Sequence, residues 1–177
     1  MTLTGADVVT AGQGRFDDVV EAGRVLDRVW EAVRSYCGWH IAPVLEGVEL
    51  VVDGTGRRTL QLPSLRVVNV VAVAEDGVEL DPTSFTWSRA GMLRKRVGCW
   101  TSEFQGIVAT VDHGRDAAPD VEGVVLQTAV RAMTAPGGQI GLRVGQIDER
   151  WATTVGGFGF FASDFEILDN HRITGSG

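Results

Sequence analysis

Hydrophobic residues recur every three or four positions between Asp17 and Cys37, which is the spacing of one face of an α-helix. Asp17 and Asp18 open this segment, where the helix dipole favours negative charge. Gly38 follows the last periodic residue and suits the left-handed position that ends many helices, and Pro43 prevents the helix from continuing. The pattern therefore predicts a helix over this segment.

From Val44 onward the pattern changes to short runs that are typical of β-strands. Residues 48–62 predict a hairpin that turns at 53–57, where an Asp-Gly pair and a second glycine supply turn geometry. The run 65–74 is apolar on both faces, as expected of a central strand. Shorter runs at 78–80, 85–87 and 107–111 predict further strands.

A second helical pattern begins at Pro119, a residue that suits the first helical turn, and stops at Pro136-Gly137-Gly138. Residues 163–166 read S-D-F-E, a capping-box pattern that predicts a short terminal helix to about Arg172. Because no strand alternates with helices, the expected fold class is α+β: a helical body with an inserted antiparallel β-sheet and an extended C-terminal arm.

This order of elements also predicts a domain organisation. We expect residues 1–16 to be a flexible arm with at most a short turn at 6–9, and residues 17–136 to be one folded domain of helix, β insertion and helix. Residues 137–177 are rich in glycine and aromatic side chains, and we expect them to form a docking arm that carries the short helix.

Composition narrows the classes of partner. The chain of 177 residues carries a formal charge of −7, which repels nucleic-acid backbones and anionic membranes but is compatible with a passage through which DNA slides. Two cysteines are too few for a disulfide scaffold and predict reduced thiols in a cytoplasmic setting. The start of the chain lacks the pattern of a signal peptide, and the run 67–74 is too short to cross a bilayer, so we expect a soluble protein.

The stretch S-Y-C-G-W-H-I-A-P-V, residues 35–44, brings a thiol and an imidazole close together in sequence. A nucleophilic cysteine needs a base within hydrogen-bonding reach, and activated thiols favour the start of a helix, whereas this cysteine lies at a helix end. We therefore interpret the stretch as a structural corner in which the aromatic and β-branched residues anchor the sheet to the first helix. Its residues are Cys37, Gly38, Trp39, Ile41 and Pro43.

Other candidate sites favour structural interpretations. Residues 112–116 read D-H-G-R-D, but one histidine with aspartate neighbours is a weak metal pattern, and a strand end with a turn explains it better. His171 suits a cation at a helix end. The C-terminal glycines match no phosphate-binding loop. The basic cluster 94–96, with tryptophans nearby in sequence, is compatible with a nucleic-acid contact, but the acidic chain favours a solvated turn or a contact with an acidic neighbouring subunit. We expect no catalytic residue, no metal and no cofactor.

The C-terminal arm is the strongest candidate for a partner contact, because it places much apolar surface in a segment too rich in glycine to form a large core. The alternative is that the segment folds back onto the sheet. The predicted docking residues are Trp151, Val155, Phe158, Phe160, Phe161, Phe165 and Ile167.

The 35–44 block resembles the head-to-tail adaptor (connector) proteins of long-tailed bacteriophages. Further blocks carry the resemblance in the expected order over about residues 16–172. They are L-P-S-L-R-V-V-N-V (62–70), E-D-G-V-E-L-D-P-T-S-F-T-W (75–87), G-C-W (98–100), V-A-T-V-D-H-G (108–114), A-P-D-V (118–121) and V-G-G-F-G-F (155–160).

This resemblance implies a structural virion protein at the head-tail neck, assembled in the host cytoplasm, and not an enzyme. It implies a ring, dodecameric in relatives, that docks under the portal protein, extends the DNA channel and offers a platform for stopper and tail proteins. Double-stranded DNA would pass through the lumen without specific binding, and residues 151–172 would occupy the place of the segment that docks on the portal. The alternatives are another neck or tail-completion protein, or a small cytoplasmic enzyme that uses Cys37 with His40 or His113.

Overall fold

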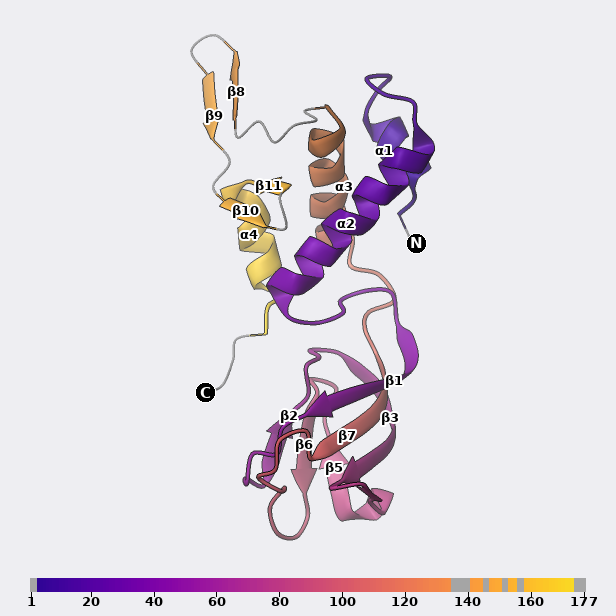
Figure 1. The fold of residues 1–177 in the computed structure, drawn as a ribbon, viewed down its shortest axis with the longest axis vertical. Helices are drawn as coiled ribbons and strands as arrows, with labels where there is room; N and C mark the ends of the chain where they lie inside the picture. The colour runs from indigo at the N-terminus through magenta and orange to yellow at the C-terminus, as the bar shows by residue number, and fades with distance from the viewer. Residues whose placement is uncertain (1–2, 135–140, 145–146, 151–152, 156–157, 174–177) are drawn as a thin grey trace. The chain divides into compact units, whose positions relative to one another are not determined.

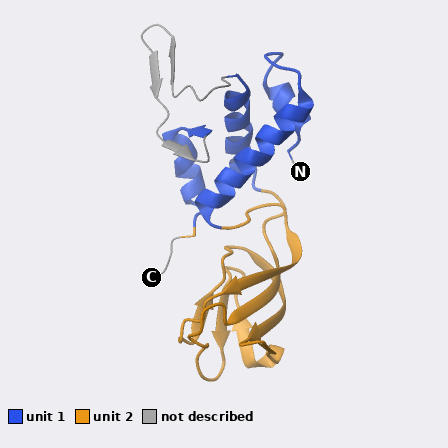
Figure 2. Cartoon of the chain, in the orientation of Figure 1, with its two compact units in different colours: residues 1–38, 118–172 blue, residues 39–117, 173–177 orange. Residues whose placement is uncertain are grey.

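The computed structural model describes residues 3–134, 141–144, 147–150, 153–155 and 158–173, and Figure 1 labels its elements. The chain forms two compact units, which are coloured separately in Figure 2. The first unit takes residues 1–38 and 118–172, and the second takes residues 39–117 and 173–177. The second unit is therefore inserted between helices of the first, and the expected α+β class is confirmed.

The long helix α2 (Val19–Cys37) belongs to the first unit and ends at Gly38 as its sequence predicts, whereas Asp18, expected within its first turn, is the residue that caps its start. Asp18 precedes it, and one carboxylate oxygen accepts hydrogen bonds from the backbone N–H groups of Val20 (3.0 Å) and Glu21 (2.9 Å). Gly38 follows it with φ of 79°, a conformation that a residue with a Cβ adopts only at a cost. The predicted helix is confirmed, with its start two residues later than expected.

The N-terminal residues differ from the expected flexible arm, because they include the helix α1 (Gly5–Ala11). The backbone N–H and the hydroxyl of Thr4 both donate to Asp7, each at 2.7 Å. The helix packs against α2 and α3 (Pro119–Thr134), and Val8 is fully buried. A helix of this length depends on tertiary contacts for its stability, so its own sequence carries little periodic signal.

The C-terminal part of the first unit holds two short hairpins and a helix. Strands β8 (Gly141–Val144) and β9 (Ile147–Arg150) form one hairpin, and β10 (Thr153–Val155) and β11 (Phe158–Phe160) form the other. The helix α4 (Ala162–Asp169) follows, as predicted. The predicted capping box is wrong, however, because Asp164 fills that role by accepting from the backbone N–H of Phe161 at 2.9 Å.

The second unit consists of two antiparallel sheets. The four-stranded sheet has the order β1-β7-β3-β4, and the three-stranded sheet has the order β2-β6-β5. The strand bounds are β1 (Leu45–Val52), β2 (Thr59–Gln61), β3 (Val67–Glu75), β4 (Val78–Glu79), β5 (Phe85–Trp87), β6 (Met92–Lys95) and β7 (Ile107–His113), with a short 3-10 turn at Pro82–Ser84.

The hairpin that the sequence predicts over residues 48–62 is wrong. Strand β1 pairs with β7 and strand β2 pairs with β6, so the two predicted partners lie in different sheets. The connecting residues instead bond to a distant loop: the N–H of Gly54 donates to the carbonyl of Glu103 (2.8 Å), and that of Gly56 donates to the carbonyl of Thr101 (3.0 Å). Turn-forming residues here carry the chain from one sheet to the other.

The core of the second unit is formed by side chains from both sheets. The central position expected of the run 65–74 is confirmed, because β3 lies between β7 and β4. The strand is not covered on both faces, however, because Val68 and Val71 are about half exposed, at 48% and 56%. Val67 and Val73 of the same strand are fully buried. The core residues are Leu60, Leu62, Val67, Val73, Phe85, Leu93, Trp100, Ile107, Ala109 and Val111.

Candidate docking surfaces

The thiol of Cys37 has the environment of a structural residue. It is the last residue of α2 and is fully buried, and its Sγ donates to the backbone carbonyl of Leu168 at 3.6 Å. Burial, together with the nearby carboxylate of Asp169, raises the pKa of this thiol to about 11. A thiol that stays protonated at neutral pH is a poor nucleophile, so the local chemistry opposes a cysteine-dependent enzyme.

The histidines of the second unit also have structural partners. A ring nitrogen of His40 lies 2.5 Å from the carbonyl oxygen of Pro43, and its ring centre lies 5.8 Å from that of His113. His113 is buried, with its Nδ1 3.2 Å from the hydroxyl of Ser64. Burial, and then the neighbouring His40, lower the pKa of His113, so this side chain stays neutral in the core.

The remaining residues of the 35–44 corner are placed as follows. Trp39 is 5% exposed and Ile41 is fully buried, whereas Pro43 is exposed and follows a cis peptide bond. The buried aromatic and aliphatic side chains agree with a space-filling role. That they anchor the sheet to α2 stays a prediction.

The residues considered as metal ligands do not converge. Asp112 points to the face of β7 opposite to that of His113, and its carboxylate accepts from the N–H of Gly47 at 2.8 Å. His171 lies 2.7 Å from a carboxylate oxygen of Asp120, a partner that its place in the sequence does not indicate. In the described part of the chain, no group of three histidine, cysteine, aspartate or glutamate side chains could hold a metal ion.

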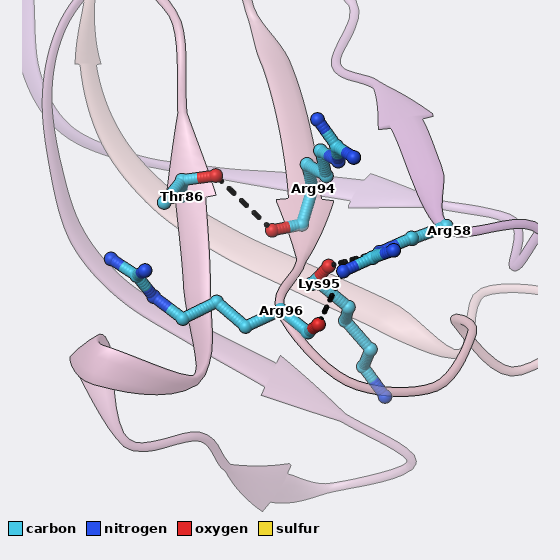
Figure 3. A pocket seen from close by; sticks show the side chains of 5 residues that line it. All are labelled: Arg58, Thr86, Arg94, Lys95 and Arg96. Atoms are coloured by element: carbon cyan, nitrogen blue, oxygen red, sulfur yellow. Dashed lines mark hydrogen bonds between the residues drawn. The ribbon is translucent and has the colours of Figure 1, made fainter.

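A basic hollow of about 350 Å³ lies on the second unit (Figure 3), lined by Arg58, Thr86, Arg94, Lys95 and Arg96. The guanidinium of Arg58 donates to the backbone carbonyls of Lys95 (3.0 Å) and Arg96 (2.5 Å), and so fastens the end of β6. The side chains of Arg94 and Arg96 point apart in Figure 3, so the cluster does not converge on one small anion. The predicted contact with an acidic subunit stays a prediction.

The C-terminal segment folds back onto the helices of the first unit. Phe158 and Phe160 are buried, at 8% and 1% exposure, and β11 packs against α3. The ring of Phe165 lies 5.8 Å from that of Phe160 and 5.1 Å from that of Tyr36 on α2. Folding back was the alternative to a free docking arm, and the described residues of the segment pack on the helices of the first unit.

The other predicted docking residues fall into two groups. Phe161 and Ile167 are half-buried, and the guanidinium of Arg131 lies 4.3 Å above the ring of Phe161. Trp151 and the side chain of Val155 lie outside the described residues. The half-buried pair therefore remains a candidate surface.

Polar contacts fix α4 on the helices that precede it. Asp164 pairs with Arg131 of α3 at 2.7 Å, which adds an ion pair to its capping bond. The hydroxyl of Tyr36 donates to Asp169 at 2.7 Å, and this contact raises the pKa of the tyrosine. These long-range pairs join residues that no sequence motif connects.

Among the described residues, the two most exposed large apolar side chains lie on the second unit, and sequence reasoning missed them. Phe104 and Val97, both between β6 and β7, are 87% and 86% exposed. Val51 on β1 and Val78 on β4 are 53% and 66% exposed. For Phe104, the sequence does contain a signal of exposure: it is the one aromatic residue in the polar stretch T-S-E-F-Q-G, residues 101–106.

No protein-family profile matches this sequence, and a search of curated proteins returns no match. Solved structures do match. A chain in the neck of a native GTA particle, computed with C12 symmetry, aligns at a TM-score of 0.61 and 11% identity. The match covers 100% of this chain and 95% of that chain. The chain has the fold of these neck structures.

Two further matches have the same extent. One is a chain in the neck of an empty GTA particle, computed with C6 symmetry, with a TM-score of 0.61 and 9% identity. The other is a chain in the virion of a native gene transfer agent (GTA) particle, with a TM-score of 0.62 and 10% identity. Each covers 100% of this chain and 95% of the other.

In the described residues, no helix combines the length and apolar character that a membrane span requires.

Proposed function

We propose that this protein is a structural component of the neck of a phage-like particle, and specifically the head-to-tail adaptor that sits under the portal. The observation that carries the proposal is the likeness to chains of GTA necks, which extends over the whole of this chain and nearly the whole of theirs. Both units of the chain therefore have a counterpart in the relatives. The proposed role is structural, and the high pKa of the Cys37 thiol supports the hypothesis that this residue is not a catalytic nucleophile.

The proposed assembly is a ring of identical subunits. The related necks were computed with C12 and C6 symmetry, which supports a twelve-fold ring. A ring contact is heterologous, so each subunit must offer two different surfaces. Both units carry exposed apolar side chains suited to such contacts, with Val20 at 66% in the first unit and Phe104 at 87% in the second.

The proposed partners are the portal on one side, and stopper and tail proteins on the other. The half-buried Phe161 and Ile167, with Trp151 and Val155, are the proposed portal-docking residues, and the buried Phe158 and Phe160 hold this surface in place. The charge of −7 suits a lumen that lets DNA pass, because acidic side chains do not bind the phosphate backbone.

The test is the copy number and position of this protein in purified particles. Quantitative mass spectrometry, scaled to the major capsid protein, should give a ring's worth of copies, and electron microscopy should place a tagged copy at the head-tail junction. Absence from particles would refute the proposal.

A second measurement separates the adaptor from other neck components. Short-range crosslinking in particles should join this protein to the portal. Crosslinks only to proteins further down the neck would assign it to another level of the same structure.

A further inference from the structure

The loop between β6 and β7, residues 96–106, presents an aromatic side chain to solvent. Phe104 is 87% exposed, the highest value among the large apolar residues that the structure describes. The next residue, Gln105, has φ of 53°, in the left-handed region that residues other than glycine seldom occupy. Such conformations persist where the surrounding structure enforces them, and they cluster at functional sites.

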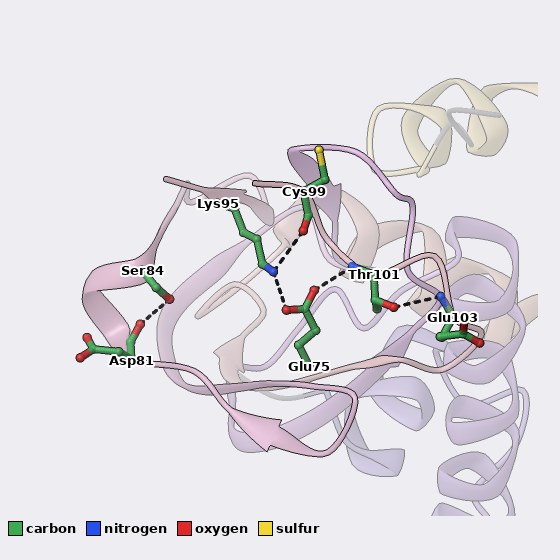
Figure 4. A network of polar contacts seen from close by, with 7 residues as sticks. All are labelled: Glu75, Asp81, Ser84, Lys95, Cys99, Thr101 and Glu103. Atoms are coloured by element: carbon green, nitrogen blue, oxygen red, sulfur yellow. Dashed lines mark hydrogen bonds and ion pairs between the residues drawn. The ribbon is translucent and has the colours of Figure 1, made fainter. Parts of the chain in front are cut away.

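The surrounding contacts hold this loop firmly (Figure 4). Glu75 accepts from the ammonium group of Lys95 and, at 2.7 Å, from the backbone N–H of Thr101. The hydroxyl of Thr101 accepts from the N–H of Glu103 at 3.2 Å. Glu75 and Lys95 are 15% and 16% exposed, so the pair is largely shielded from water.

A second set of bonds ties the loop to the chain after β1. The N–H of Gln105 donates to the carboxylate of Asp53 at 2.7 Å, and the N–H of Gly54 donates to the carbonyl of Glu103 at 2.8 Å. A Cβ on Gly54 would lie 2.1 Å from the carbonyl oxygen of Thr101, so only glycine permits this approach. The loop is therefore preorganised, which lowers the entropy lost when it binds a partner.

The first unit carries a shallow hollow that is open to solvent and lined mostly by apolar surface. Its volume is about 400 Å³. Its floor includes the buried side chains of Ala32 on α2 and Phe158 on β11. The guanidinium of Arg28 lies 5.3 Å from the Phe158 ring at one edge, and Ser35 is exposed at the rim.

Charge also matches across the two surfaces. The hollow is also edged by the exposed carboxylates Asp27 and Glu31. Glu31 pairs with Arg34 at 2.8 Å, so Asp27 is the acidic group that answers the cation of Arg28 on the same rim. The two joined loops carry the exposed Arg57 and Arg96, whose side chains make no ion pair with the described residues. Opposite charges at the rim of a contact favour one partner and one orientation.

We propose that Phe104 of one copy inserts into the α2–β11 hollow of a second copy, and that this contact repeats around the ring. The inference rests on the proposed ring, and it fixes which two surfaces each subunit uses. The occupant is a second copy because this chain carries both the rigid aromatic anchor and an apolar hollow edged by carboxylates. A buried aromatic at the centre of an interface, surrounded by polar contacts, is the usual form of a binding hot spot.

The experiment is site-directed crosslinking in assembled particles. Every variant carries Cys99→Ser, because Cys99 is exposed on the same loop, whereas the buried Cys37 is kept. One copy carries F104C and the other carries S35C, and the two are co-expressed in cells that produce particles and lack the wild-type gene. A short bismaleimide should give a crosslinked dimer of one F104C and one S35C chain. A chain carrying both substitutions should give a ladder of multimers.

The matched control replaces F104C with V78C, on a strand whose Val78 is 66% exposed. This control should give no dimer with S35C. A second variant, F104A, should bind neighbouring copies roughly tenfold or more weakly and lower the number of copies per particle, as loss of a hot-spot side chain does. Its thermal midpoint should match that of wild type, because the side chain is exposed.

The outcomes distinguish this inference from the proposed function. Particles that hold a full ring but give no F104C–S35C dimer would overturn the inference and leave the neck function intact. Crosslinks of F104C to a different protein, or only within its own chain, would overturn it as well. If no copies are found in particles, the proposed function fails, and the inference fails with it.

Discussion

The substitution Phe160→Ala tests whether the C-terminal segment is part of the folded first unit. The Phe160 side chain is 1% exposed and packs beside Phe165. An aromatic side chain of this kind buries about 150–250 Å², which at about 25 cal/mol per Å² corresponds to about 4–6 kcal/mol. Measured substitutions of buried phenylalanine by alanine cost about 3–5 kcal/mol, so we expect the free energy of unfolding of the first unit to fall by that amount.

The assay is urea-induced unfolding followed by far-UV circular dichroism, because all four described α-helices belong to the first unit. Phe104→Ala is the matched control: the same chemical change at an 87% exposed position should alter stability by less than about 0.5 kcal/mol. A Phe160→Ala variant that loses less than about 1 kcal/mol would refute the packing described here, because a buried cavity costs more than that. The segment would then be a free arm, as the sequence suggested.

Three further predictions follow from individual contacts. Glu75→Gln should lower the stability of the second unit by about 1–3 kcal/mol and speed hydrogen exchange in residues 96–106, because Lys95 loses its partly buried partner. Asp164→Ala should cost about 1–3 kcal/mol, measured by thermal unfolding, because it removes both a helix cap and an ion pair. The pKa of the Cys37 thiol is about 11 in the folded chain, against an ordinary value of 9.0. Because the thiol ionises at lower pH in the unfolded chain, the free energy of unfolding should fall as the pH rises from about 9 to about 11. At neutral pH a thiol reagent should modify the exposed Cys99 quickly and Cys37 only after unfolding, and Cys37→Ala should remove the alkaline loss of stability.

The long helices were predictable because their signals are local. The apolar period, the aspartate before α2 and Gly38 after it all lie within one segment. The same is true of α3, which begins at Pro119 as the sequence indicates. The turn after β3 also has a local signal, an Asp-Gly pair, and both Asp76 and Gly77 take positive φ there.

Strand pairing was not predictable in the same way. An Asp-Gly turn between two β-like runs favours a hairpin, yet β1 and β2 bond to different sheets. Their partners β7 and β6 lie far along the chain, and the loop 96–106 competes for the hydrogen bonds of the turn. The choice between a local hairpin and two distant pairings depends on the combined core of both sheets, which no single segment encodes.

The candidate docking residues also show the difference between what a local sequence pattern indicates and what long-range contacts decide. Aromatic residues in a glycine-rich segment indicated a partner surface, but the structure uses two of them, Phe158 and Phe160, as core. Phe104 lies in a polar loop and was not among the predicted docking residues, yet it is the most exposed large apolar side chain in the described residues. Burial depends on which other segments arrive at a position, and sequence composition does not report that.

The sequence by itself determined the α+β class, the position of the β insertion between helices, and the end of α2 at Cys37. Each rests on periodicity, capping or charge within about twenty residues, where local backbone physics decides the outcome. Only the tertiary structure decided which strands pair, how Asp164 caps α4, and which apolar side chains face solvent. Those properties arise from long-range contacts, whose free energy belongs to pairs of segments and not to either segment alone.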